Sequence, residues 1–474
     1  MPVDRARLHR ALNPGTVVVV GDKGPNYQWL TNCAEFSGQL YSVQLDEKEI
    51  PGIEAKGVRN FKGLMEVPGE VDLVICAVPR NVAPYIVADA VKKQVGGVAM
   101  FTSGFVETAE PAGIELQARI VALANEGGLP VVGPNCMGVY NRRLGVKFMA
   151  GQEKGEGGAI SIVSQSGTHG IGMTVGSQRL GVPVTRTISI GNAAVLNEAD
   201  YLEYLLDDPD TPAIAMYLEG VRDGRRFFNL LREGTKRKPV IIWRGGRTKA
   251  GARAVKSHTA SLASDDAVWM SLIRQCGAIS TESLEDTVEA IAALVHTPRS
   301  SRKNLALVAM TGGQSVAITD QFERAGFEVP ELSEASYRRL GEFFVTIGGS
   351  YRNPFDASST IGRESDNLQK ILEILAEDRA IEGVAIELQT REFDKGTERM
   401  DGMLALMRRY REQTGHPVVA LIPAGGPGDQ EEVSLRARSY VAKAGFPVFS
   451  SFRAGAQALG RIRAYYEELE ARTR

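Results

Sequence analysis

The sequence predicts an α/β protein built from doubly wound parallel sheets, and three observations support this fold class. Short apolar runs that do not alternate with polar residues recur along the 474-residue chain, as is typical of strands buried on both faces. Segments with helical spacing lie between them, so strands and helices alternate. The pattern in the middle of the chain repeats in its last third. We therefore expect a Rossmann-like domain followed by two flavodoxin-like doubly wound domains.

Two polar segments divide the chain into three predicted domains. GQEKGEGG at 151–158 and TPRSSRKN at 297–304 have the composition of linkers. The predicted domains are therefore residues 1–150, 151–300 and 301–474.

Composition and charge favour a cytoplasmic globular protein. The net charge is −2 and no block of like charge occurs, so nucleic acids and membrane surfaces are not expected partners. The N-terminus lacks the apolar core of a signal peptide, and no run is long enough to span a membrane. The four cysteines are scattered without a CxxC pair, so we expect reduced thiols and neither a metal site nor disulfides: Cys33, Cys76, Cys136 and Cys276.

The first predicted domain opens with a strand over 16–20 that runs into GDKG at 21–24, a pattern typical of nucleotide-binding βαβ units, although the G-x-G-x-x-G fingerprint is absent. Ligands of such sheets bind at the carboxyl ends of the strands. Lys23 and Lys48 are therefore candidate phosphate contacts, with solvated surface lysines as the alternative. Further strands are predicted at 40–45, 71–78, 97–102 and 129–132, with helices at 82–93 and 110–127.

A candidate anion site begins the second predicted domain. A strand over 159–163 leads into SQSGT at 164–168 and then into a predicted helix over 169–180. Free amides and the helix dipole at such a start favour phosphate. Ser166, Gly167 and Thr168 are therefore candidate phosphate ligands, although Ser166 is also a good helix N-cap. The elements that follow are helices at 198–206 and 224–236 and a strand at 213–218 that ends at Glu219.

The most distinctive segment is GGRTKAGARAVKSHTASLA at 245–263, which follows a predicted strand over 240–243. Its glycines and small residues predict a loop. A neutral imidazole is a competent nucleophile toward phosphorus, and basic groups attract phosphate. His258 is therefore a candidate phosphate-handling residue, with an incidental histidine on a solvated loop as the alternative. Five basic side chains surround it: Arg244, Arg247, Lys249, Arg253 and Lys256.

Helices at 265–276 and 284–295 complete the second domain, and the third domain repeats its pattern. The strands at 305–309, 383–388 and 417–422 echo those at 160–163, 213–218 and 239–243. The two copies differ where chemistry is expected: Gln389 stands in the place of Glu219, and nothing in 425–436 matches His258. This contrast favours a functional role for both residues. His169 is interpreted as packing or solvent-facing, and no role is assigned to His9, His296 or His416.

Six motifs, in order, resemble those of the CoA-ligase (α-type) subunits of the NDP-forming acyl-CoA synthetases, a family that includes the succinyl-CoA synthetase α-subunit. The resemblance covers nearly the whole chain. The motifs are GFVET at 104–108, GPNCMG at 133–138, SQSGT at 164–168, YLEG at 217–220, GRTKAGARAVKSHTASLA at 246–263 and NPFD at 353–356.

The resemblance implies a ligase that works through two phosphorylated species. An acyl-CoA thioester and inorganic phosphate give an acyl phosphate and free CoA. A histidine then takes the phosphoryl group and carries it to ADP or GDP on an ATP-grasp domain. His258 stands in the position of the phosphohistidine, and Glu219 in that of a carboxylate that hydrogen-bonds the imidazole. Ser166, Gly167 and Thr168 would hold the phosphate.

The resemblance also implies a CoA site and a partner. The chain has no ATP-grasp domain, so a separate ATP-grasp β-type subunit would bind ATP or ADP with Mg²⁺ in a hetero-oligomer. The substrates would be a small carboxylic acid and its CoA thioester; the motifs do not specify the acyl group. A buried core position is the alternative for Cys136. The implied CoA contacts are Gly21, Lys23, Lys48, Val78, Pro79, Ser103, Gly104, Asn135 and Cys136.

The sequence departs from the family pattern at three places. GDKGPNYQW follows the first strand where a Pro-Gly-Lys loop is usual, and QLDEKEIPG follows the second where Asn-Pro is usual. These changes bear on the CoA phosphate contacts. Ala260 replaces the glycine of the usual SHTG, and alanine adopts fewer backbone conformations than glycine.

Two other functions remain open on the sequence. One is a non-catalytic acyl-CoA-binding or regulatory protein of the same fold. The other is a nicotinamide-linked oxidoreductase, which the missing G-x-G-x-x-G disfavours, since Asp46 is the one loosely placed acceptor for a ribose.

Overall fold

The computed structural model describes residues 4–259, 266–361, 365–390, 393, 395–423 and 431–473, with the backbone alone at 256–259, 365 and 473. The chain forms two compact units. The first contains residues 1–178 and 183–284, and the second contains residues 179–182 and 285–474.

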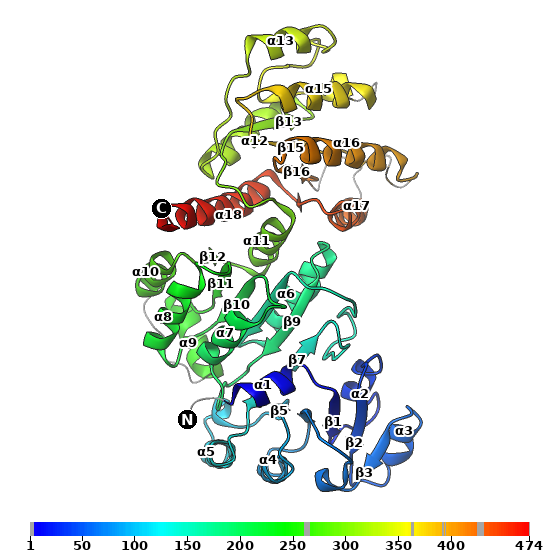
Figure 1. Ribbon diagram of the computed structural model, residues 1–474, viewed down its shortest axis with the longest axis vertical. Coiled ribbons are helices and arrows are strands. Elements are labelled where there is room, and N and C mark those ends of the chain that lie inside the picture. The colour runs from blue at the N-terminus through cyan, green and yellow to red at the C-terminus, as the bar shows by residue number, and fades with distance from the viewer. Residues whose placement is uncertain are drawn as a thin grey trace. The chain divides into compact units, whose positions relative to one another are not determined.

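The first sheet of the first unit has six parallel strands in the order β3-β2-β1-β4-β5-β6 (Figure 1). This is the strand order of a Rossmann fold, so the predicted Rossmann-like domain is confirmed. Its central strands β1 and β4 are apolar apart from Thr16 at the start of β1, because helices cover both faces. The strands are β1 Thr16–Val20, β2 Gln39–Val43, β3 Arg59–Phe61, β4 Leu73–Cys76, β5 Gly97–Met100 and β6 Val131–Val132. The helices are α1 Arg5–Leu12, α2 Gln28–Asn32, α3 Ile50–Glu54, α4 Ala83–Lys92 and α5 Pro111–Glu126, with short 3₁₀ turns η1 Leu64–Glu66 and η2 Val106–Thr108.

The second sheet has the order β12-β11-β10-β8-β9-β7. Counted along the chain without β7, this is the 2-1-3-4-5 order of flavodoxin-like folds, as predicted. The edge strand β7 comes from the end of the first domain and pairs antiparallel with β9. The strands are β7 Gly138–Asn141, β8 Ile160–Ser164, β9 Val184–Ser189, β10 Ile214–Leu218, β11 Val240–Arg244 and β12 Ile279–Thr281. The helices are α6 Gly167–Arg179, α7 Glu198–Asp207, α8 Gly224–Gly234, α9 Lys249–Thr259 and α10 Asp266–Cys276; the next helix, α11 Leu284–His296, belongs to the second unit from residue 285 on.

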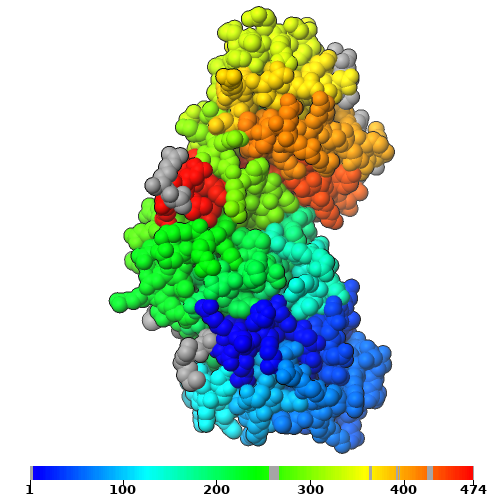
Figure 2. All heavy atoms as spheres, viewed as in Figure 1, coloured from blue at the N-terminus to red at the C-terminus, as the bar shows by residue number. Residues whose placement is uncertain are grey.

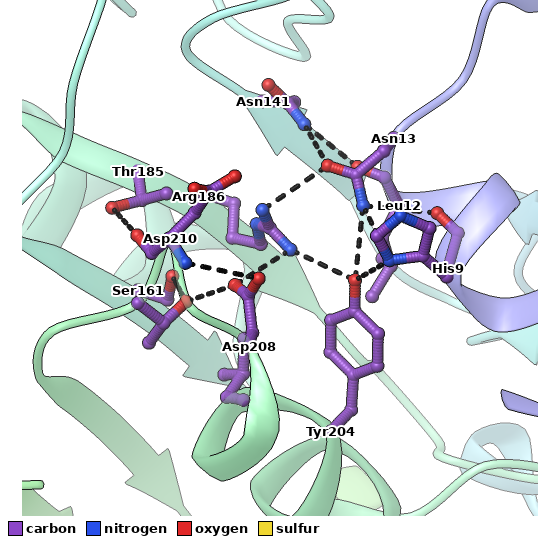
Figure 3. A network of polar contacts seen from close by, with 12 residues as sticks. His9, Leu12, Asn13, Asn141, Ser161, Thr185, Arg186, Tyr204, Asp208 and Asp210 are labelled. Carbon is purple, nitrogen blue, oxygen red and sulfur yellow. Dashed lines mark hydrogen bonds and ion pairs between the residues drawn. The ribbon is translucent and has the colours of Figure 1, made fainter. Parts of the chain in front are cut away.

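A buried arginine links the second sheet of the first unit to the segment after α1 (Figure 3), and the blue and green parts of this unit lie in contact in the space-filling view (Figure 2). Arg186 on β9 is 1% exposed. Its Nη1 lies 3.1 Å from the Asp208 carboxylate and donates to the Tyr204 hydroxyl at 3.2 Å. Its Nη2 donates to Asn13 Oδ1, just after α1, at 3.3 Å. The sequence pattern did not predict β9, because this charged residue interrupts its apolar run; the paired carboxylate makes its burial possible.

The second unit contains one parallel sheet in the order β14-β13-β15-β16-β17. This is again 2-1-3-4-5, so the predicted second flavodoxin-like domain is confirmed. The strands are β13 Leu305–Ala309, β14 Phe355–Asp356, β15 Gly383–Glu387, β16 Val418–Leu421 and β17 Val448–Phe449. The helices are α12 Gly312–Arg324, α13 Glu334–Gly341, α14 Ser358–Ile361, α15 Ser365–Glu377, α16 Glu398–Thr414, α17 Glu431–Lys443 and α18 Phe452–Thr473.

One prediction about local structure is wrong. The segment that begins at Gly245 was expected to be a loop, but residues 249–259 form the helix α9. Thr248 accepts the amide of Gly251 at 3.0 Å and so caps the start of the helix. Alanine, lysine and arginine, all strong helix formers, outnumber glycine in the sequence KAGARAVKSHT.

Candidate active site

The turn after β1 is closed by two carboxylates. The buried Asp22 accepts the amides of Trp29 and Leu30 at 3.0 and 2.9 Å, and the amide of Gly24 donates to Glu49 at 2.9 Å. Burial raises the pKa of Asp22, although these hydrogen bonds oppose the shift. Amides of this turn and of α2 are therefore occupied by acidic side chains. These contacts are the structural counterpart of the sequence GDKG, which replaces the usual Pro-Gly-Lys loop.

The candidate CoA contacts of the first sheet lie at its carboxyl edge but differ in exposure. Gly21 has φ +82°, and a Cβ there would lie 2.6 Å from the Val78 side chain, so the turns after β1 and β4 touch. Lys23, Lys48, Pro79 and Ser103 are exposed, whereas Val78 is 9% exposed. No side-chain hydrogen bond brings the two lysines together with the other candidates among the residues described.

Cys136 is a buried thiol. It is 4% exposed, and its Sγ lies 3.4 Å from the carbonyl of Met100, to which it donates. Burial raises the pKa of Cys136 to about 12. The residue is therefore a protonated thiol at neutral pH and packs as a small core side chain.

Gly104 and Asn135 are linked to the second sheet through a polar chain that the sequence did not predict. The amide of Gly104 donates to Glu107 Oε1 at 2.7 Å, and Asn192 Nδ2 donates to Glu107 Oε2 at 2.6 Å. Asn135 Nδ2 donates to Asn192 Oδ1 at 3.3 Å. Burial alone would raise the pKa of Glu107, but the hydrogen bonds from Asn192 and Gly104 lower it. Glu107 is therefore an ionised link between the two domains.

The candidate phosphate ligands stand at the start of α6. Ser166 Oγ accepts the amide of His169 at 3.3 Å, as an N-cap does, and Thr168 is exposed. A Cβ on Gly167 would lie 2.8 Å from Met137, so the backbone approaches the segment before β7 closely there. The first turn of a 13-residue helix thus lies at the carboxyl edge of the sheet, where its dipole favours an anion.

Glu219 lies beside this helix start. Its amide and that of Gly220 both donate to Gln165 Oε1, so the residue before Ser166 holds the end of β10. The Tyr217 hydroxyl donates to Glu219 Oε1 at 3.2 Å. Glu219 is 7% exposed, and among the residues that the structure describes nothing hydrogen-bonds its buried Oε2. A buried carboxylate oxygen without a donor is costly and is often found where a ligand or reacting group belongs.

His258 lies in the last turn of α9, and its side chain lies outside the described part of the structure. The helix contacts η2, so it approaches the GFVET segment of the first domain. Arg244 and Arg247 form ion pairs with Asp266 at 2.9 and 3.4 Å, so their charges are engaged within the fold. Lys249 and Arg253 are exposed, and the side chain of Lys256 is not described.

Sequence reasoning missed an aromatic triangle beneath the site. The rings of His169, Tyr217 and Trp243 have centroid separations of 4.5, 4.4 and 4.5 Å. His169 therefore packs, as interpreted from the sequence. Tyr217 lies two residues before Glu219, a spacing that puts both on one face of an extended strand and could have identified it.

The described residues contain neither a metal-binding cluster nor a membrane-spanning helix. No group of three histidine, cysteine, aspartate or glutamate side chains in them could hold a metal ion. None of their helices combines the length and the apolar character that crossing a bilayer requires.

Family models match both domains of the first unit. One described as a CoA binding domain matches residues 15–142, and one described as a succinyl-CoA ligase like flavodoxin domain matches residues 157–294. The chain is 30% identical over 447 residues to the alpha subunit of an ADP-forming acetate–CoA ligase II of Pyrococcus furiosus, covering 92% of this chain and 93% of that one.

Two further proteins resemble the chain. The ADP-forming acetate–CoA ligase I of Archaeoglobus fulgidus is 30% identical over 433 residues, which span 90% of this chain and 60% of that protein. The structure of the dinucleotide-forming acetyl-coenzyme A synthetase 1 of Ca. Korarchaeum cryptofilum, in complex with phosphate and ADP, has a TM-score of 0.83 and 26% identity, with 98% of each chain covered.

Proposed function

The chain belongs to the CoA-ligase (α-type) subunits of the NDP-forming acyl-CoA synthetase family, and from this premise we propose that it catalyses acyl-CoA + phosphate + NDP = carboxylic acid + CoA + NTP. In the first step, a phosphate oxygen attacks the thioester carbonyl and CoA leaves as a thiolate, which takes up a proton. In the second, the imidazole of His258 attacks phosphorus and the carboxylate leaves. In the third, the phosphoryl group passes to the nucleotide.

The observation that carries this proposal is the open oxygen of Glu219 beside the start of α6. Gln165 links the two features, since it precedes Ser166 and accepts the amides of Glu219 and Gly220. A carboxylate on one ring nitrogen fixes the tautomer of an imidazole and supports the charge that develops on it. Ser166, Gly167 and Thr168 would stabilise the phosphoryl group electrostatically.

CoA is proposed to lie along the carboxyl edge of the first sheet. Gly21, Val78, Pro79, Ser103, Gly104 and Asn135 would contact it through their backbone or small side chains, and Lys23 and Lys48 through charge. Cys136 would contribute from the core behind the turn. Because Asp22 and Glu49 accept the amides of Lys23 and Gly24 in the turn after β1, we expect the lysine side chains rather than those amides to carry the CoA phosphate contacts.

A separate ATP-grasp β-type subunit is proposed as the partner. The chain matches an alpha subunit over nearly its whole length, and it spans 60% of the acetate–CoA ligase I of Archaeoglobus fulgidus. That subunit would bind ADP or ATP with Mg²⁺, giving a hetero-oligomer whose substrate is a small carboxylic acid. Four free, buried cysteines suit a reducing cytoplasm.

The reaction is tested by mixing the purified chain with its ATP-grasp subunit, Mg²⁺, ADP, phosphate and acetyl-CoA as probe. We expect thiol release and ATP formation in equal amounts with both subunits present, and no ATP when either subunit is omitted. His258→Ala should abolish ATP formation, with His416→Gln in the second unit as a control that retains it. Binding of CoA by calorimetry without any turnover would instead support the non-catalytic acyl-CoA-binding protein.

A further inference from the structure

The steps proposed above assign no role to the aromatic triangle of His169, Tyr217 and Trp243, which contacts Glu219 through Tyr217. His169 belongs to the first turn of α6, Tyr217 to β10 and Trp243 to β11, so three adjacent elements meet there. Tyr217 and Trp243 are 6% and 9% exposed. Packing against two rings leaves Tyr217 little rotational freedom, and its hydroxyl is the one polar atom that it can offer to Glu219.

The second unit contains the same contact with different chemistry. The strand register places Glu387 on β15 where Tyr217 lies on β10, and Gln314 on α12 where His169 lies on α6. Gln314 Nε2 donates to Glu387 Oε1 at 2.6 Å, and the amide of Met310 donates to Glu387 Oε2 at 2.9 Å. Contact between these two positions is thus a property of the fold, because it occurs in both copies. What distinguishes the first copy is the side chain at one of these positions: Tyr217 carries a hydroxyl that donates to Glu219, whereas the second copy has Glu387 there.

From this geometry, and resting on the proposed function, we propose that Tyr217 is a positioning residue. Its hydroxyl engages Glu219 Oε1, fixes the rotation of the carboxylate, and leaves Oε2 as the acceptor for the imidazole that carries the phosphoryl group. Burial, together with the charge of Glu219, raises the pKa of Tyr217, so the hydroxyl keeps its proton at neutral pH. Packing against His169 and Trp243 holds the Tyr217 ring in place, and the Tyr217 hydroxyl orients the Glu219 carboxylate.

The test is Tyr217→Phe, which keeps the ring stack and removes the hydroxyl. The probe is ³²P-labelled acetyl phosphate, and the readout is the rate and concentration dependence of labelling of the full chain. We expect the maximal rate to fall about tenfold, as the loss of one hydrogen bond to a charged group implies, with half-saturation changed by less than about twofold. Tyr140→Phe is the matched control, because its buried hydroxyl donates to the carbonyl of Glu153, outside the site.

A double-mutant cycle separates positioning from a structural role. If Tyr217 acts through Glu219, Tyr217→Phe should cost nothing further in a Glu219→Gln background. The same tenfold loss in that background, or no loss in the wild-type background, would overturn the inference. A wild-type chain that labels normally leaves the proposed function intact in either case, whereas a wild-type chain that never labels would remove the proposed function and this inference with it.

Discussion

Glu219 is a buried carboxylate, and its Oε2 has no hydrogen-bond donor among the described residues. Its amide and one carboxylate oxygen are held by Gln165 and Tyr217, so the remaining oxygen has a fixed direction. The sequence predicted this residue from its place at a strand end and from its replacement by Gln389 in the internal copy. Glu107 and Asn192 were not predicted, because they meet across elements that only folding brings together. Tyr217 was missed although its spacing to Glu219 could have identified it.

Glu219→Gln should slow labelling of the chain by acetyl phosphate about 100-fold, since an amide keeps the shape but orients an imidazole less well. The midpoint of thermal unfolding should stay within about 2 °C of wild type, because the lost charge is buried and its Oε2 has no partner among the residues described. Quenched time courses measure the labelling rate, and a thermal melt measures the midpoint of unfolding. Wild-type labelling by this variant would contradict the role assigned to the carboxylate.

Cys136 should resist alkylation in the native protein. Burial raises the pKa of its thiol to about 12, so below that pH the reactive thiolate is scarce, and the side chain is inaccessible as well. Iodoacetamide at pH 8 followed by peptide mass spectrometry should find it unmodified, and fully modified in urea. Rapid modification without denaturant would show that this residue faces the ligand cleft.

At the scale of elements, apolar runs predicted most strands, and the errors have physical causes. β9 was missed because a buried ion pair interrupts it, and β7 because a strand of four residues leaves its own domain to join the next sheet. α9 was expected to be a loop because two glycines precede it, although its composition favours a helix. β7 and β9 pair with each other although they are far apart in the sequence, and a single sequence does not show directly which segments pair.

The Arg186–Asp208 pair should be a principal stabilising contact between β9 and α7. Asp208→Ala would leave the guanidinium buried without its counter-ion, so we expect the free energy of unfolding of the first unit to fall by about 3 kcal/mol. Asp207→Ala, which removes an adjacent carboxylate that is 46% exposed, should cost less than about 1 kcal/mol. Equal effects of the two variants would contradict this account.

Tryptophan fluorescence in urea measures this difference selectively. The chain contains three tryptophans, Trp29, Trp243 and Trp269, and all belong to the first unit. Their signal therefore reports the unfolding of that unit without a contribution from the second.

At the scale of the whole molecule, one α/β design occurs three times with a division of roles. The Rossmann strand order and the two 2-1-3-4-5 sheets were predicted from the alternation of elements and from the internal repeat. Both flavodoxin-like sheets place a helix start and a buried glutamate at the carboxyl edge. In the first copy Glu219 keeps a buried oxygen without a donor among the described residues. In the second, Gln389 stands in its place, and Glu387, at the position of Tyr217, has both oxygens engaged.

The central claim is that His258 carries a phosphoryl group, and peptide mapping after incubation with ³²P-labelled acetyl phosphate tests it most directly. The account predicts label that is stable in alkali and lost in acid, recovered on the peptide that contains His258 and absent from His258→Ala. Label retained by His258→Ala, or recovered on a different peptide, would contradict it.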